Sequence, residues 1–179
     1  MRKGTANTWV EISSDAISHN LKIFRDLAGD GVELLCVVKA NGYGHGMCEV
    51  GRLAVEAGAT WLGVFSVAEG LALREAGIAS KVLVMGPFGA SEVKAAKDSN
   101  LSLTIGSLDA ARLYLDSGGS SGDPPVHLKL ETGTNRQGIR FEELEGLSNM
   151  FSDGNVLVEG AYTHFADIED TTDHGLANS

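Results

Sequence analysis

Short apolar runs alternate along this chain with stretches whose apolar residues recur at helical spacing, and this alternation limits the fold more than any other feature. Six runs rich in branched and aliphatic residues are expected to form buried strands. They cover residues 34–39, 61–65, 82–85, 101–105, 126–130 and 156–163. Amphipathic helices are expected between them, at residues 46–57, 67–76, 90–99, 108–117 and 141–150. Strands alternating with helices predict an α/β protein, in which helices cover a parallel sheet.

The chain opens with a different pattern. Residues 8–13 alternate apolar and polar side chains and are expected to form a short strand. Ser14 or Asp15 then caps a helix. The apolar stripe of this helix is formed by Ile17, Leu21, Phe24 and Leu27. A stretch rich in glycine, serine and proline at residues 117–125 is interpreted as a surface connection and not as a domain boundary.

The number of strands leaves two architectures open. A closed β/α barrel has eight strands and typically about 250 residues. This chain has 179 residues, and the barrel-type runs number about six. The sequence stops shortly after the last of these runs and an acidic loop. An open six-stranded sheet and a truncated barrel both fit this count.

Charge and composition exclude several classes of partner. The net charge is -10 and no Lys/Arg cluster stands out, so the acidic surface would repel a phosphate backbone and no nucleic acid is expected as a partner. No run approaches the roughly 18 to 20 apolar residues that span a bilayer, so no membrane association is expected. The N-terminal residues lack the apolar segment of a secretory signal. Cys36 and Cys48 fit neither a disulfide framework nor a metal site, which favours the cytoplasm.

Lys39 stands at the end of the first long apolar run, directly before a glycine-rich segment. In a strand it would share a face with Leu35 and Val37, and in a barrel it would reach the carboxyl-terminal mouth, where barrel enzymes place catalytic groups. Desolvation there would lower its pKa and enlarge the neutral fraction, which suits imine formation with a carbonyl cofactor or substrate. A lysine that simply reaches solvent from the end of a strand would fit this position equally well.

The glycine-rich segment after Lys39 contains Gly42, Gly44 and Gly46, with Tyr43 and His45 between them. Such a turn between strand and helix can be open enough for backbone amides to approach an anion, and the tyrosine hydroxyl would suit a phosphate. A plain tight turn is the simpler interpretation of the glycines alone.

A second segment places Val126, Leu128 and Leu130 on one strand face, and His127, Lys129 and Glu131 on the other. If the apolar set faces the helices, Lys129 points into the barrel interior. An unpaired buried ammonium is costly, so Lys129 must be paired, neutral or modified. A structural pair with Glu131 or another carboxylate is one way to meet this requirement.

A third segment, residues 159–167, contains His164, which shares strand parity with Tyr162 near the expected mouth. A histidine in this position can be a hydrogen-bonded core residue or can take part in catalysis. The segment also contains acidic residues that could suggest a metal site. No second histidine lies three or four positions from His164, however, so no metal is expected.

The glycine-rich segment, together with the start of the chain, resembles the alanine racemases. Residues 38–46, Val-Lys-Ala-Asn-Gly-Tyr-Gly-His-Gly, are similar to the cofactor-lysine motif of that family, with Gly42 where alanine is usual. Residues 8–12, Thr-Trp-Val-Glu-Ile, and the later His19-Asn20-Leu21 match the family's opening.

Two later segments extend the resemblance. Residues 131–138 resemble the family's second motif, an acidic residue, then Thr-Gly, and an arginine before a glycine. Glu131 stands where aspartate is common, and Thr134 and Gln137 replace frequent apolar residues. Residues 163–166, Thr-His-Phe-Ala, are similar to a third motif.

The resemblance implies a fold. These racemases are pyridoxal-phosphate enzymes with an N-terminal β/α barrel and a C-terminal β-domain. Residues 1–179 would form the N-terminal part of a TIM-type (β/α)8 barrel that binds pyridoxal 5'-phosphate, truncated after about six strands. The C-terminal β-domain would be absent, together with the second catalytic base and most of the phosphate-binding loop.

The resemblance also implies roles for individual residues. Lys39 would hold pyridoxal 5'-phosphate as an internal aldimine and act as a base on the substrate α-proton. Tyr43 would bond the cofactor phosphate, Arg136 would donate to its phenolic oxygen, and His164 would lie beside its ring. Lys129 matches a position that is often carbamylated, which would create an anion able to pair with Arg136. A surface salt bridge is the alternative for Arg136.

The expected function is that of an alanine racemase, a cytoplasmic homodimer that interconverts L- and D-alanine and supplies D-alanine for peptidoglycan. The substrate would be a small amino acid. The present chain is expected to be inactive alone, because it carries one base. Two alternatives remain open: another pyridoxal-phosphate barrel enzyme, such as a broad-specificity racemase, D-amino-acid aldolase or decarboxylase, and a non-catalytic cofactor-binding fragment.

Overall fold

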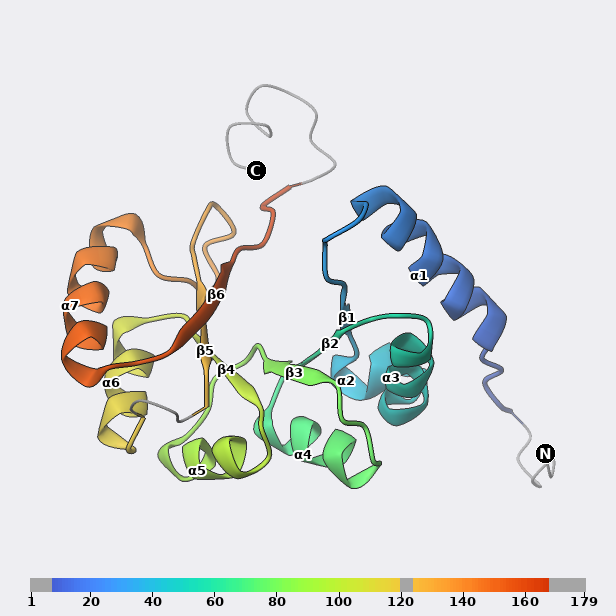
Figure 1. Ribbon diagram of the computed structural model, residues 1–179, viewed down its shortest axis with the longest axis horizontal. Helices are drawn as coiled ribbons and strands as arrows, with labels where there is room; N and C mark the ends of the chain where they lie inside the picture. Colours follow the sequence, from blue (N-terminus) through green and yellow to red (C-terminus); the bar gives the residue numbers. More distant parts are fainter. Residues whose placement is uncertain (1–7, 120–123, 168–179) are drawn as a thin grey trace.

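The computed structural model describes residues 8–119 and 124–167, and within these ranges a single parallel sheet organises the chain. Its strands lie side by side in sequence order, from β1 to β6. They are β1 (Leu35–Val37), β2 (Trp61–Val64), β3 (Lys81–Val84), β4 (Ser102–Ile105), β5 (Val126–Lys129) and β6 (Val158–Tyr162). Figure 1 shows the sheet curving, with helices outside it. This is half of a TIM-type barrel, as the resemblance implies.

One helix, α1, precedes the first strand, and the other helices connect successive strands along the convex side of the sheet (Figure 1). They are α1 (Ser14–Ala28), α2 (Lys39–Tyr43), α3 (Met47–Glu56), α4 (Val67–Glu75), α5 (Ala90–Asp98), α6 (Leu108–Asp116) and α7 (Leu144–Gly154), with a short 3-10 turn, Phe141–Glu143, before α7. Among the described residues, no helix combines the length and apolar character needed to cross a membrane.

The apolar core lies between the convex face of the sheet and these helices. Val64 of β2, Val84 of β3 and Leu103 of β4 are fully buried, and they pack in one cluster with Leu73 of α4 and Ala96 of α5. Side chains alternate between the two faces along a strand, so the residues next to these core residues in each strand face the concave side. In a closed barrel the concave side would be the interior.

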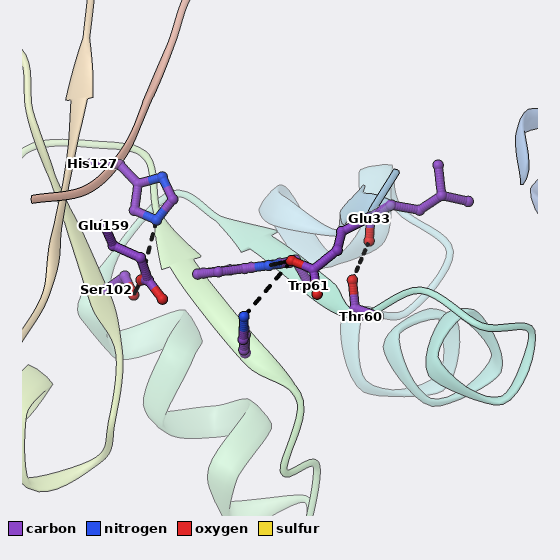
Figure 2. A network of polar contacts seen from close by, with 8 residues as sticks. Glu33, Thr60, Trp61, Ser102, His127 and Glu159 are labelled. Atoms are coloured by element: carbon purple, nitrogen blue, oxygen red, sulfur yellow. Dashed lines mark hydrogen bonds and ion pairs between the residues drawn. The ribbon is translucent and has the colours of Figure 1, made fainter. Parts of the chain in front are cut away.

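The concave face is polar near the amino ends of the strands (Figure 2). His127 Nε2 lies 3.2 Å from Glu159 Oε2, and Ser102 Oγ donates to the same oxygen at 3.0 Å. The His127 and Trp61 rings also meet edge to face, with centroids 5.1 Å apart, and Trp61 Nε1 donates to Glu33. This end of a barrel contributes stability, whereas catalytic groups gather at the opposite end. We therefore interpret the network as structural.

Residues 8–13 form no strand, so that expectation is wrong. A strand requires a neighbour to complete its ladder of hydrogen bonds, and the described part of the chain places none beside these residues. The segment is exposed instead. The helix cap is also one residue earlier than expected, because the Ser13 side chain accepts a hydrogen bond from the Ala16 amide at 3.2 Å.

The other expected elements are all present, with shifted ends. The first long strand stops at Val37, two residues before Lys39. The last helix begins at Leu144, after the 3-10 turn, and continues to Gly154. Only part of the apolar stripe of α1 packs against the core: Leu21 contacts it, whereas Phe24 and Leu27 are exposed.

Candidate active site

The residues singled out from the sequence lie at the carboxyl ends of three strands. Lys39 and Tyr43 follow β1, Lys129 ends β5 with Arg136 in the loop after it, and His164 follows β6. In β/α barrels this end of the sheet carries the active site, because the loops there bring side chains from several strands together. The topology thus gathers these residues at one mouth.

The backbone after Lys39 forms a left-handed turn. Ala40, Asn41, Gly42 and Tyr43 all have φ between 52° and 63°, a region that L-residues other than glycine disfavour. Asn tolerates this conformation because its side chain bonds locally, and here Asn41 Oδ1 accepts the Met47 amide at 3.0 Å. Backbone strain of this kind is concentrated at functional sites, where the surrounding structure must hold it.

The glycine-rich turn does not present its amides to an anion, contrary to one sequence expectation. The amides of Gly42, Gly44, His45 and Gly46 all donate to carbonyl groups within residues 38–42. They satisfy the tight turn itself, which is the simpler of the two interpretations. The Tyr43 side chain is exposed, so its hydroxyl remains available to a ligand.

Lys39 is half-buried and lies against an aromatic ring. Its Nζ is 6.0 Å from the centroid of Phe65, which follows β2. Glu69 of α4 binds the backbone on both sides of this contact, since its carboxylate accepts the Ala40 amide at 2.9 Å and the Phe65 amide at 2.6 Å. Sequence reasoning missed Glu69. The Ser-x-x-Glu pattern at residues 66–69 indicates a helix start but not this contact with Ala40 of α2.

Lys129 is buried, 7% exposed, and its Nζ lies 5.4 Å from the centroid of the Tyr162 ring. Burial lowers the pKa of Lys129, and the charges of Arg136 and Lys39 lower it further, whereas Glu131 acts in the opposite direction. Arg136 and Lys39 therefore both lie close enough to Lys129 to act on its charge. The concave orientation expected for Lys129 is confirmed, because Leu128 and Leu130 pack on the helix-side core.

The structural pair with Glu131 does not form. In the described part of the chain, no carboxylate lies within ion-pair distance of Lys129. The Glu131 carboxylate accepts the backbone amides of Gly133 at 2.6 Å and Asn135 at 3.0 Å, and these bonds lower its pKa. Glu131 thus shapes the loop that carries Arg136.

Arg136 lines a hollow of about 450 Å³ at the ends of β3, β4 and β5. Thr104, Gln137 and Arg140 also line it, whereas Lys39 and His164 do not. Within residues 8–119 and 124–167, the Arg136 guanidinium forms no ion pair, so the surface salt bridge considered from the sequence is not found. Its donors therefore remain available to an anionic or polar ligand.

His164 is exposed, so it is not the buried core histidine considered from the sequence. Its backbone carbonyl accepts the Thr134 hydroxyl at 3.0 Å. A second contact between the same loops joins the Thr132 and Thr163 hydroxyl oxygens at 2.6 Å. These threonines tie the loop that carries Arg136 to the end of β6.

The lowered pKa of Lys129 gives a testable pH dependence. The folded chain releases this proton at a lower pH than the unfolded chain, so the unfolded chain binds more protons between the two pKa values. The free energy of unfolding of the parent should therefore rise, relative to that of Lys129→Met, as the pH increases toward about 10.4, the ordinary lysine pKa. Urea unfolding of both chains at about pH 7 and about pH 10 measures this difference.

Lys22→Met is the control for that experiment, because Lys22 is exposed on α1. Its difference from the parent should stay within about 0.5 kcal/mol at both pH values. If the difference between the parent and Lys129→Met did not change with pH, the assigned effect of burial would be wrong.

The fold and the gathered residues define a class: half of a β/α barrel with a lysine just after the first strand and further basic groups at the same mouth. The family model described as "Alanine racemase, N-terminal domain" matches residues 12–178. The chain belongs to this family.

Curated relatives agree with this assignment. Alanine racemase 2 of Oceanobacillus iheyensis is 38% identical over 167 residues, 92% of this chain and 43% of the relative. The alanine racemase of Desulforamulus reducens is 39% identical over 166 residues, 90% of this chain and 45% of the relative. The chain therefore spans less than half the length of these relatives.

Solved structures show the same half-barrel. The alanine racemase of Bacillus anthracis with bound L-Ala-P superimposes with a TM-score of 0.88 at 32% identity, covering 99% of this chain and 46% of that one. A histidine racemase from Leuconostoc mesenteroides superimposes with a TM-score of 0.80 at 27% identity, covering 91% of this chain and 44% of that one.

Proposed function

We propose that this chain is the lysine-bearing part of a pyridoxal-phosphate-dependent racemase that acts on alanine. The observation that carries the proposal is the placement of Lys39, a half-buried amine at the barrel mouth beside Lys129 and Arg136. Membership of the alanine racemase family supports both the cofactor and the reaction.

The residues present fit pyridoxal phosphate. Lys39 supplies the amine that an aldehyde requires, and Tyr43 exposes a hydroxyl for a phosphate. The Arg136 guanidinium, which pairs with no carboxylate of the described residues, can donate to a phenolic oxygen. His164 would lie beside the cofactor ring. Once bound, the cofactor would withdraw electrons from the substrate α-carbon and acidify its proton.

The contribution of this chain to the reaction is one base and its surroundings. The neutral amine of Lys39 removes or returns the α-proton on one face of the substrate. A second base on the opposite face would come from a further part of the protein, so the 179-residue chain should not invert alanine by itself.

Lys129 is proposed to carry a carbamate. Its lowered pKa supports this, because carbon dioxide adds to the neutral form of an amine. The modification would replace a buried cation by an anion next to Arg136, which removes the like-charge repulsion between the two. The carbamate would thereby hold the Arg136 side chain toward the cofactor. The whole enzyme is proposed to be a cytoplasmic homodimer that supplies D-alanine for peptidoglycan.

Attachment of the cofactor tests the proposal directly. Pyridoxal phosphate is added to the purified chain, the mixture is reduced with borohydride, and the labelled residue is identified by mass spectrometry. Label concentrated on Lys39 is the expected result. A label spread over exposed lysines such as Lys22 and Lys94, with none in excess on Lys39, would contradict it.

Histidine is a second candidate substrate, since a histidine racemase shares the half-barrel. The loaded chain can be offered alanine, serine, lysine, histidine and D-threonine in deuterated water. One base suffices for exchange of the α-proton, and exchange fastest with alanine is expected. If the α-proton of another amino acid exchanged faster, that amino acid and not alanine would be the substrate.

A further inference from the structure

Glu69 joins the segments that follow two neighbouring strands, β1 and β2, at the point where Lys39 lies. One carboxylate oxygen accepts the Ala40 amide, directly after Lys39, at 2.9 Å, and the other accepts the Phe65 amide, directly after β2, at 2.6 Å. Hydrogen bonds to an ionised carboxylate are among the stronger ones in proteins. The same side chain therefore sets the backbone position of Lys39 and of the ring against its Nζ.

The contact departs from the usual role of a glutamate at this helix position. Ser66 caps α4 and accepts the Glu69 amide, so a glutamate there would ordinarily reach back to the amide of the cap residue. Glu92 does so with Gly89 before α5, and Glu143 does so with Arg140. Glu69 instead binds the residue before the cap and, across 29 positions, a residue of another element.

The location explains why such a contact would be needed. Before Lys39, the Val38 amide donates to the Gly63 carbonyl of β2 at 2.8 Å, which continues the sheet. After Lys39, the chain enters the left-handed turn, where the sheet no longer holds it. Glu69 provides the next attachment, so Lys39 is fixed from both sides.

We propose that Glu69 is a positioning residue that holds the Lys39 amine at the mouth of the half-barrel. The inference rests on the proposed function, in which Lys39 receives the cofactor aldehyde. Glu69 itself is not expected to touch the substrate.

The test compares Glu69→Ala and Glu69→Gln with the parent chain and with Glu75→Gln. Glutamine keeps one acceptor oxygen and alanine keeps none, so the effects should be graded. Glu75 is exposed on the same helix and controls for the change of charge. Two readouts need no cofactor: hydrogen exchange of the Ala40 and Phe65 amides, and the methylation of Lys39 by formaldehyde and borohydride relative to exposed Lys22. The third readout is the equilibrium constant for attachment of pyridoxal phosphate.

We expect Glu69→Ala to weaken attachment of the cofactor about tenfold or more, because small displacements of a reacting group are costly. Glu69→Gln should lie between it and the parent, and Glu75→Gln should match the parent. Exchange of the Ala40 amide should accelerate and the methylation ratio should change in the same order. A purely structural role for Glu69 would leave that ratio unchanged in the folded chain.

The inference is overturned if the folded Glu69 variants keep the parent's methylation ratio and amide exchange. If Glu69→Ala does not fold, Glu69→Gln decides by the same measurements. If the parent takes up no pyridoxal phosphate, the proposed function fails, while the two cofactor-free readouts still decide the role of Glu69.

Discussion

Lys39→Arg should abolish covalent attachment of pyridoxal phosphate, reducing labelling at position 39 by about 100-fold or more, to background. Arginine keeps the positive charge and the length of the side chain, and it can still lie over the Phe65 ring. Its guanidinium does not lose its proton in proteins, however, so it cannot supply the neutral nucleophile that an aldehyde requires. The loss would therefore be chemical and not structural.

The measurement is the amount of reduced label per chain, together with the free energy of unfolding. Lys94→Arg is the matched control, because Lys94 is exposed on α5 and pairs with Asp98. Both variants should keep the stability of the parent within about 0.5 kcal/mol. A folded Lys39→Arg chain that still binds the aldehyde covalently at parental levels would show that the cofactor amine is another residue.

The fold was predictable from the sequence because its signal is repetitive. Residues 82–85 are apolar throughout, as expected for a strand covered on both faces, and residues 101–105 carry leucine or isoleucine at every second position. The structure places β3 and β4 at these two runs. Segment 8–13 carries the alternating pattern of a strand but remains exposed, since a strand also requires a partner. Pattern indicates the tendency of a segment, and pairing decides its outcome.

The candidate site was less predictable, because its geometry depends on contacts distant in sequence. The left-handed turn includes Ala40, whose residue type gives no indication of a positive φ. Glu131 appeared able to pair with Lys129 from strand parity alone, but its carboxylate binds amides of its own loop. The link from Glu69 to Ala40 spans 29 positions and follows from the packing of α4 against the sheet.

Gly138→Ala should destabilise the chain by about 2 to 4 kcal/mol and displace Arg136, two residues before it. Gly138 has φ of 151°, and a Cβ atom built there would lie 2.5 Å from the Glu131 amide nitrogen and 2.7 Å from the Leu130 carbonyl carbon. Both are backbone atoms, so no side-chain movement can relieve the clash. The loop must move away from the end of β5, where Ile139 exchanges hydrogen bonds with Lys129 and Glu131.

The same substitution at Gly146, Gly146→Ala, should stabilise the chain, in contrast to Gly138→Ala. Gly146 lies within α7, and no neighbouring group of the described residues lies within 4 Å of a Cβ built there, so alanine should raise helix stability by about 0.5 to 1 kcal/mol. Urea unfolding of both variants measures the two signs, and cofactor labelling at Lys39 reports on the loop. Because Arg136 lies in the loop that Gly138 anchors, Gly138→Ala should weaken labelling even where the chain remains folded, whereas Gly146→Ala should leave it unchanged. A Gly138→Ala chain as stable as the parent and equally labelled would mean that the loop after β5 has freedom to shift without consequence for Arg136.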